Sequence, residues 1–183
     1  MKGGMREAGL ALAVLVSSAV SAHATGQPLT VDELARLKKY ATQTTLSFEN
    51  YAGPIGLGSI GLIGFQFDQF VTDHIYWGPA IFGAVTGNRG GYGIAAIGVG
   101  HQLRILPCVY WDSKLLAGSG GGSGVHTGGG FLVHGVTGVQ VEMFSGLRVA
   151  MHGGYLDFPT GGFRTPVASI ALVFTGRKVS LPY

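Results

Sequence analysis

Residues 61–71 have the sequence GLIGFQFDQFV, in which large apolar side chains occupy every second position. In an extended chain, Ile63, Phe65 and Phe67 point to one side, whereas Gln66 and Asp68 point to the other. Because side chains alternate between faces with a period of two, this stretch predicts a β-strand with one apolar and one polar face. A helix would spread the same apolar residues around its whole circumference, which excludes a one-faced helix here.

The same alternation recurs along most of the chain and predicts eight strands. They are expected at 44–52, 60–71, 75–86, 92–105, 108–117, 129–143, 147–158 and 165–175. Most of these segments reach the about 9–11 residues that a tilted strand needs to cross a bilayer. Strands of soluble sandwiches are shorter, at about 5–6 residues.

The connections between the predicted strands alternate between short and long along the chain. Short ones fall at 72–74, 106–107 and 144–146, and longer glycine-containing ones at 53–59, 87–91, 118–128 and 159–164. This alternation is typical of outer-membrane barrels, with turns on the periplasmic side and loops outside. The sequence therefore predicts an all-β fold: an eight-stranded antiparallel up-and-down transmembrane β-barrel with glycine-rich loops. A soluble periplasmic barrel of the lipocalin type, binding an apolar ligand, is the alternative.

The composition agrees with a lipid-covered protein. The 183 residues are 46% hydrophobic and 11% charged, against about 25% charged in ordinary soluble domains. Such a chain is not disordered, and its single cysteine excludes a disulfide scaffold. The 33 glycines follow no three-residue period, which excludes collagen.

Residues 1–24 have the features of a secretory signal peptide. Lys2 and Arg6 precede the apolar run LALAVLV at 10–16, and Ala22 and Ala24 supply the small residues before a cleavage site. A membrane anchor is the alternative, but the apolar run is shorter than the about 18–20 residues of a spanning helix. We expect export to the bacterial outer membrane of a Gram-negative cell envelope. Cleavage would lower the formal charge from +3 to +2, which disfavours a nucleic-acid partner.

Thr30 and Glu33 form a capping box, which predicts a short amphipathic helix of about ten residues before the barrel. The helix could lie on a membrane surface, plug one end of the barrel, or be solvated without a task. The predicted organisation is a periplasmic segment at 25–43, the barrel at 44–175 and a tail at 176–183. Either Phe174 or Tyr183 is expected to end the last strand.

If the apolar faces meet lipid, the opposite faces fill the barrel. The predicted inward residues are Glu49, Gln66, Asp68, Gln102, Arg104, Asp112, Lys114, His134, Gln140, Glu142, Arg148, His152 and Ser169. Acids and bases are nearly balanced in this set, as a closed polar core requires. An eight-stranded barrel is only wide enough for side chains to fill it, so we expect a filled interior and no pore.

Several residues are predicted to face outward or into the loops. An aromatic girdle at the headgroups is expected from Trp77, Tyr92, Trp111, Tyr155 and Phe158. His101 falls among apolar outward neighbours and does not fit that pattern. On the outer loops, Arg89, His126 and Arg164 are candidates for contacts with lipopolysaccharide phosphates.

Ser169, His152 and Glu142 are candidates for a catalytic set, since acyl transfer uses a nucleophile, a base and an acid. No G-x-S-x-G elbow supports this set, and a hydrogen-bonded interior network is the alternative. The histidines show no metal-ligand spacing, and no cofactor is expected.

The chain resembles the small eight-stranded outer-membrane barrels of the OmpA transmembrane-domain type and the PagL-type lipid A deacylases. The resemblance is one of architecture and covers residues 44–175. To the deacylases it is greatest in the late strands, at 147–158 (LRVAMHGGYLDF), a Gly/Pro-containing loop, and 167–174 (VASIALVF). The deacylase family carries a His-x-Ser-Asn motif on the penultimate strand and a Glu on the last. His152 matches the motif's His, but Gly153 and Gly154 follow it, and the last strand has no acid.

The resemblance implies a non-enzymatic barrel with a structural or surface-interaction role, and as an alternative a lipid A-modifying acyl hydrolase. It further implies outer-membrane lipids, including lipopolysaccharide, and the barrel-assembly machinery as partners.

Overall fold

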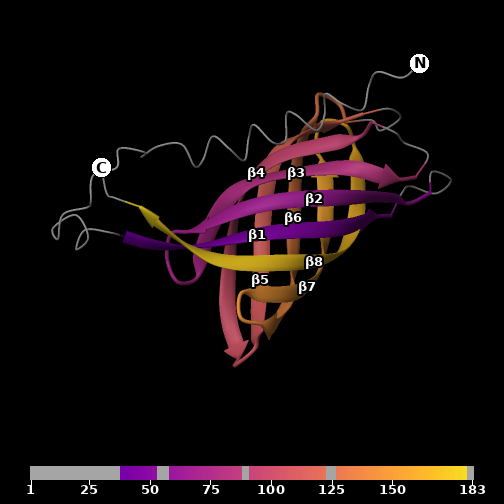
Figure 1. Ribbon diagram of the computed structural model, residues 1–183. Helices are drawn as coiled ribbons and strands as arrows, with labels where there is room; N and C mark the ends of the chain where they lie inside the picture. Colours follow the sequence, from indigo (N-terminus) through magenta and orange to yellow (C-terminus); the bar gives the residue numbers. More distant parts are fainter. Residues whose placement is uncertain (1–37, 53–57, 88–90, 123–126, 181–183) are drawn as a thin grey trace, which may run out of the picture. The chain divides into compact units, whose positions relative to one another are not determined.

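A computed structural model describes residues 38–52, 58–87, 91–122 and 127–180. These residues form one closed barrel in which each strand pairs antiparallel with the next and the last pairs with the first (Figure 1). The strands are β1 (Lys38–Tyr51), β2 (Ile60–Phe70), β3 (Ile75–Thr86), β4 (Gly93–Leu106), β5 (Val109–Gly121), β6 (Phe131–Phe144), β7 (Leu147–Phe158) and β8 (Phe163–Ser180).

The predicted eight-stranded fold is confirmed, with longer strands where the barrel closes. β1 and β8 pair from Lys38 and Ser180 at one end to Tyr51 and Val167 at the other. The hydrogen bonds between paired strands join backbone groups and do not depend on side chains. These two strands therefore continue beyond the segments in which apolar and polar residues alternate. Residues 176–180, predicted as a tail, are strand, so β8 continues past Phe174 to Ser180. Tyr183 lies outside the described residues.

The predicted helix and signal peptide lie largely outside the described residues. Lys38 and Lys39 fall in the segment predicted to precede the barrel, at 25–43, but belong instead to β1. In the part of the chain that the structure describes, no helix is long and apolar enough to cross a membrane.

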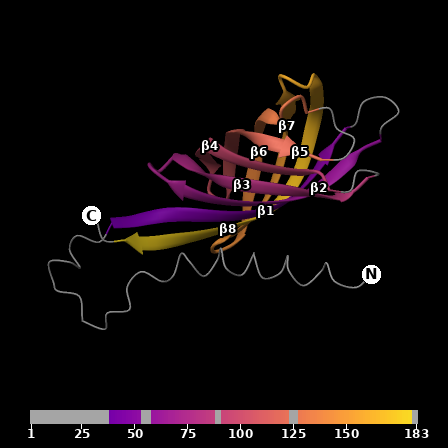
Figure 2. The same cartoon turned by 90° about the horizontal axis from the view of Figure 1, so that it is seen from above.

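The predicted alternation of short and long connections is confirmed for the first six connections: those after β2, β4 and β6 are short, and those after β1, β3 and β5 are longer. The prediction was wrong after β7, where β8 begins early and the connection at 159–162 is no longer than the β2–β3 turn at 71–74. The β6–β7 turn is Ser145-Gly146, where Gly146 has a φ of 86°, a left-handed conformation that favours glycine. The first residues of β1 and the last residues of β8 lie side by side at the end of the barrel that carries the short turns (Figure 2).

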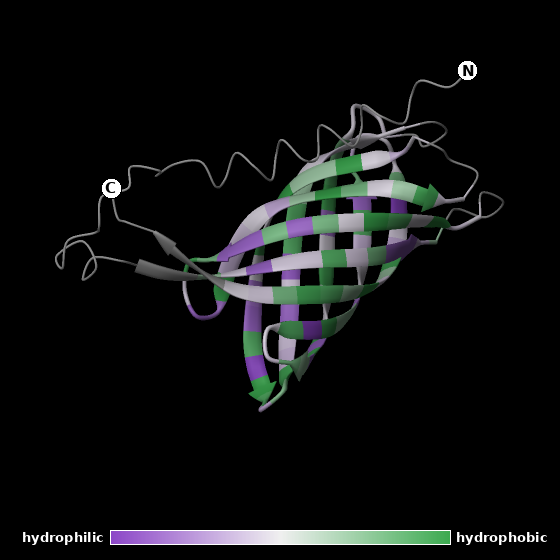
Figure 3. Ribbon diagram, in the orientation of Figure 1, coloured by the Kyte–Doolittle hydropathy of each residue, from purple (hydrophilic) through white to green (hydrophobic). Residues whose placement is uncertain are grey.

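Hydrophobic and hydrophilic residues alternate along the strands (Figure 3). Most of the exposed large side chains are apolar, whereas the buried ones are both polar and apolar. On β2, Ile63, Phe65 and Phe67 are exposed, whereas Gln66 and Asp68 are buried. This is the reverse of a soluble domain, in which large apolar side chains collect in the core. It is the arrangement of a barrel that meets lipid with its outer face.

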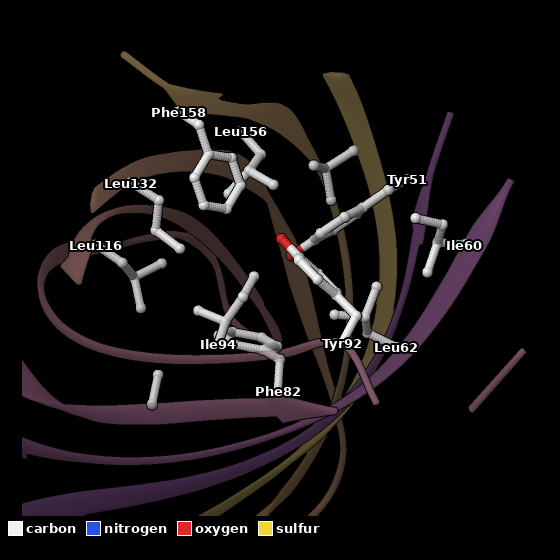
Figure 4. Close-up of a cluster of buried hydrophobic side chains, with 12 residues drawn as sticks. Tyr51, Ile60, Leu62, Phe82, Tyr92, Ile94, Leu116, Leu132, Leu156 and Phe158 are labelled. Atoms are coloured by element: carbon white, nitrogen blue, oxygen red, sulfur yellow. The ribbon is translucent and has the colours of Figure 1, made fainter. Parts of the chain in front are cut away.

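Apolar side chains fill the interior at the end with the long loops (Figure 4). The buried cluster consists of Tyr51, Ile60, Leu62, Ala80, Phe82, Tyr92, Ile94, Leu116, Leu132, Leu156, Phe158 and Val167. The girdle prediction was therefore wrong for Tyr92 and Phe158. Phe158 has the parity of the inward positions of β7 and packs at 6.0 Å, between ring centroids, against Phe163. Only the half toward the short turns contains the predicted polar network.

Candidate functional site

The centre of the polar half is a buried ion pair between β5 and β2. Lys114 Nζ lies 2.7 Å from Asp68 Oδ2 and donates a second hydrogen bond of 2.6 Å to Gln66 Oε1. Gln43 donates to the same Asp68 oxygen at 3.2 Å. Burial removes the hydration of both charges, so the close pairing and these extra hydrogen bonds are what make them tolerable.

A second cluster surrounds Asp112. Tyr76 donates a hydrogen bond of 2.7 Å to Asp112 Oδ1, and His152 Nε2 lies 3.1 Å from Asp112 Oδ2. The ammonium of Lys114 sits 5.0 Å from the centre of the Tyr76 ring, within cation–π range. This ring joins the two clusters across the interior.

The third cluster lies nearest the short turns and is built around Arg148. Its guanidinium stacks on Tyr110 at 3.7 Å from the ring centre, donates to Gln102 at 2.9 Å, and lies 3.9 Å from Glu142. Gln102 in turn donates to Gln140 at 3.0 Å. Planar guanidinium groups suit such combined stacking and hydrogen bonding.

Glu49 marks the border between the polar and the apolar halves. It accepts a hydrogen bond of 3.0 Å from Tyr51 and lies 3.8 Å from His134 Nε2. His134 also makes edge contacts with Tyr51 and Phe82. Glu49 also lines a cavity together with Lys114 and Asp112, so its carboxylate lies between the polar clusters and the apolar cluster.

Arg104 is not buried in the interior as predicted, and its guanidinium lies 5.9 Å from the centre of the Tyr110 ring, at the edge of the Arg148 cluster. Arg104 has the inward parity of β4 but is exposed, and it donates to the backbone oxygens of Leu106 and Pro107. β4 extends beyond the enclosed section at this position, so parity alone no longer means burial.

The three catalytic candidates are only partly brought together. His152 and Ser169 are register partners on β7 and β8, but the acid beside His152 is Asp112, while Glu142 belongs to the Arg148 cluster. His152, Ser169 and Asp112 line a cavity of about 20 Å³. This space suits a water molecule and not an acyl chain.

The same cavity is lined by Gln43 and Ser47. Among the described residues, Gln43 Oε1 and Ser47 Oγ have no hydrogen-bond partner although both are buried. Buried polar groups are normally satisfied by protein or by ordered water, so the cavity is suited to hold a bridging water between them.

Sequence reasoning missed the tyrosines and the glutamine that complete these clusters. Tyr51, Tyr76 and Gln43 share the inward parity of their strands, and that parity is the signal that could have identified them. Tyr110 likewise shares the inward parity of Asp112 and Lys114 on β5.

The remaining predicted positions lie on the outside or outside the described residues. Arg164 is exposed and pairs with Asp157 at 3.0 Å, whereas Arg89 and His126 are outside the described residues. Cys108 is a free, exposed thiol. Within the described part of the chain, no three His, Cys, Asp or Glu side chains are grouped to hold a metal ion.

No protein-family model and no curated protein sequence matches the chain. A structure reported under "De novo design of transmembrane beta-barrels" is similar, with a TM-score of 0.53, 8% identity, and coverage of 75% of this chain and 95% of that chain. Neisserial surface protein A (TM-score 0.45, 13% identity) and Ail, the attachment invasion locus protein of Yersinia pestis (TM-score 0.46, 11% identity), each match 76% of this chain and 97% of their own.

At these identities the likeness concerns the fold alone. The designed barrel shares the β-barrel fold of this chain. The more specific resemblance to OmpA-type or PagL-type barrels stays a prediction.

Proposed function

We propose that this chain is an outer-membrane barrel protein with a sealed interior, whose role is structural or lies in surface interactions made by its loops. The observation that carries this proposal is that the barrel exposes large apolar side chains and buries charged ones. Large apolar side chains such as Phe65 and Ile97 are exposed, whereas Asp68, Asp112 and Lys114 are buried. Water would disfavour that exterior, and a bilayer favours it.

The sealed interior supports a role other than general diffusion. The apolar cluster occupies the loop end, and the polar clusters centred on Lys114, Asp112 and Arg148 occupy the rest. The cavity between the polar clusters measures about 20 Å³, close to the space of one water molecule. These clusters and the small size of this cavity support a barrel whose described part offers ions and solutes no open path along the axis.

Export and partners follow as part of the same proposal. The signal-peptide features of residues 1–24 support removal of this segment during export. Outer-membrane lipids, including lipopolysaccharide, would surround the wall, and the barrel-assembly machinery would insert it.

Fractionation combined with heat-modifiable gel migration tests the proposal. Folded barrels migrate faster than the same chain after boiling, so we expect a fast band from the unheated outer-membrane fraction and a slower one after heating. Release of the protein by osmotic shock would instead support the soluble periplasmic alternative.

One observation favours a second candidate, a lipid A-modifying acyl hydrolase. His152 lies beside Asp112 and opposite Ser169 in register, so a base, an acid and a hydroxyl share one face. The small cavity argues against this candidate, since a substrate carbonyl has no room there. Mass spectrometry of lipid A from expressing cells decides: loss of an acyl chain that depends on His152 would establish the enzyme.

A further inference from the structure

Two histidines lie side by side on the outer surface, next to the turn between β2 and β3. His74 belongs to that turn and His101 to β4, and both side chains are exposed. Their imidazole ring centroids are 6.1 Å apart and the ring planes are inclined by 44°. The two residues are far apart in the sequence and meet through the pairing of β3 with β4. This contact gives His101 a polar neighbour among the apolar outward residues of its strand.

The sheet fixes the separation of the two histidine backbones. Gln102 N donates a hydrogen bond of 2.7 Å to His74 O, and Ile75, the residue after His74, is the register partner of His101. Within the turn, the hydroxyl of Thr72 accepts hydrogen bonds from His74 N at 3.3 Å and from Ile75 N at 2.9 Å. The two imidazoles are therefore held near each other without a ligand, which lowers the cost of binding one between them.

Both imidazoles have nitrogen atoms available to a ligand. Their aromatic contacts are with each other and, for His101, with Trp111, whose ring centroid is 6.4 Å away. Within the described residues, neither imidazole forms a hydrogen bond. A neutral imidazole has one accepting nitrogen, and this nitrogen is the commonest metal ligand that proteins offer.

The separation of the rings fits two imidazoles bound to one metal ion. A ring nitrogen lies about 1.15 Å from the ring centre and a metal–nitrogen bond measures about 2.0–2.1 Å, so two rings on one ion have centres about 5.2 Å apart at a tetrahedral angle and about 6.4 Å apart at most. The observed 6.1 Å lies within this range. Rotation of the two exposed side chains about their χ angles brings the rings to the tetrahedral separation.

We propose that His74 and His101 bind one divalent transition-metal ion, with one nitrogen ligand from each side chain. Imidazole suits Zn²⁺, Cu²⁺ and Ni²⁺, of which Cu²⁺ binds most tightly. Among the residues that the structure describes, no third His, Cys, Asp or Glu is grouped with this pair, so water completes the coordination. Structural metal sites have four protein ligands, and this one with two holds an exchangeable ion.

The place of the pair indicates where the ion comes from. The turn that carries His74 is one of the short turns, which face the periplasm in the proposed orientation. Asp73 on the same turn is exposed and adds negative charge near the ion, which favours a cation there. Binding itself needs only the folded barrel, so the inference goes beyond the proposed function and is tested without a membrane.

The tryptophan beside His101 reports binding. Because Trp111 is close to His101, bound Cu²⁺, a paramagnetic ion, should quench its fluorescence. In a Trp77→Phe, Cys108→Ser background, Trp111 is the only tryptophan and the exposed thiol, a competing ligand, is absent. The full chain without a histidine tag is titrated with Cu²⁺ in detergent micelles, and we expect saturable quenching at one ion per chain. Quenching that does not saturate overturns the proposal.

Two single variants and a control distinguish a shared ion from separate surface histidines. The second ligand binds intramolecularly, so His74→Gln and His101→Gln should each weaken the apparent affinity for Cu²⁺ about a hundredfold. Both side chains are exposed, so these variants keep the barrel folded. His126→Gln, at a position outside the described residues, should leave the affinity unchanged. Parent-like affinity in either single variant, or an equal loss in His126→Gln, overturns the proposal.

The stability of the barrel supplies a second measurement. An ion that binds only the folded chain stabilises it, and at a hundredfold excess over its dissociation constant it raises the ratio of folded to unfolded protein about a hundredfold. We expect saturating Cu²⁺ to raise the urea midpoint of the parent chain in micelles and to leave that of His101→Gln unchanged. An unchanged midpoint in the parent, or the same rise in His101→Gln, contradicts a site that joins the β2–β3 turn to β4.

Discussion

Replacing Lys114 by methionine tests whether the polar clusters hold the barrel together. Lys114 is the cation bound to Asp68, whose carboxylate is fully buried. In Lys114→Met that carboxylate keeps only the 3.2 Å hydrogen bond from Gln43, and Gln66 loses its donor. An uncompensated buried charge costs about 3–5 kcal/mol, and we expect the free energy of unfolding to fall by this amount.

Two further variants make the test specific. Combining Lys114→Met with Asp68→Leu removes both charges and should recover stability to within about 1–2 kcal/mol of the parent chain, because well-packed apolar replacements of an ion pair are often near neutral. Arg164→Gln is the matched control, since the Arg164–Asp157 pair is similarly close, at 3.0 Å, but its side chains are 67% and 29% exposed. Exposed pairs contribute about 0–1 kcal/mol.

Equilibrium urea unfolding in lipid vesicles, followed by tryptophan fluorescence and by the heat-modifiable gel shift, measures all three variants. A cost for Lys114→Met no greater than that for Arg164→Gln would refute the reasoning. So would a double variant that is as unstable as the single one.

Three other substitutions and one control test the remaining parts of the interior by the same unfolding assay in lipid vesicles. Tyr76→Phe removes the donor to buried Asp112 and should cost about 1.5–3 kcal/mol, whereas Tyr155→Phe on the exposed wall should change stability by less than about 0.5 kcal/mol; equal effects would contradict the Asp112 cluster. Leu132→Ala empties part of the fully buried apolar cluster and should cost about 2–5 kcal/mol, so a neutral result would mean that the loop end is loosely packed. Gly138→Ala places a methyl group against the backbone of β7 and should lower the unfolding midpoint clearly, and a variant as stable as the parent would show that the ladder there can shift.

The faces of the strands could be predicted from the sequence because a period of two is a local property. Ile63, Phe65 and Phe67 needed no knowledge of neighbours to be assigned outward, and the buried positions of Asp68, Asp112 and Lys114 follow from the same alternation. The number of strands follows from counting the alternating segments between turns.

The contacts inside the barrel could not be predicted, because they depend on how the sheet staggers as it closes. Lys114 and Asp68 are 46 residues apart, and no local pattern indicates that they meet. The same reason explains the catalytic candidates: Asp112, and not Glu142, lies beside His152. Glu142 faces Arg148 because these two are register partners on β6 and β7.

The predicted surroundings of side chains near the strand ends were also wrong. Arg104 and Phe158 both have inward parity, but one lies where the strand projects beyond the enclosed section and the other where side chains close the barrel. The alternation of apolar and polar residues indicates which face of the sheet a side chain occupies. It does not indicate how far along each strand the barrel encloses its interior.

The most direct test of the membrane assignment uses the two natural tryptophans. Trp77 and Trp111 are the only tryptophans of the chain, and they face outward with 46% and 44% of their surface exposed. In vesicles of brominated phosphatidylcholine we expect the intrinsic fluorescence to be quenched strongly, and aqueous acrylamide to quench it weakly. Strong quenching by acrylamide with no effect of the brominated lipid would contradict a lipid-facing outer wall.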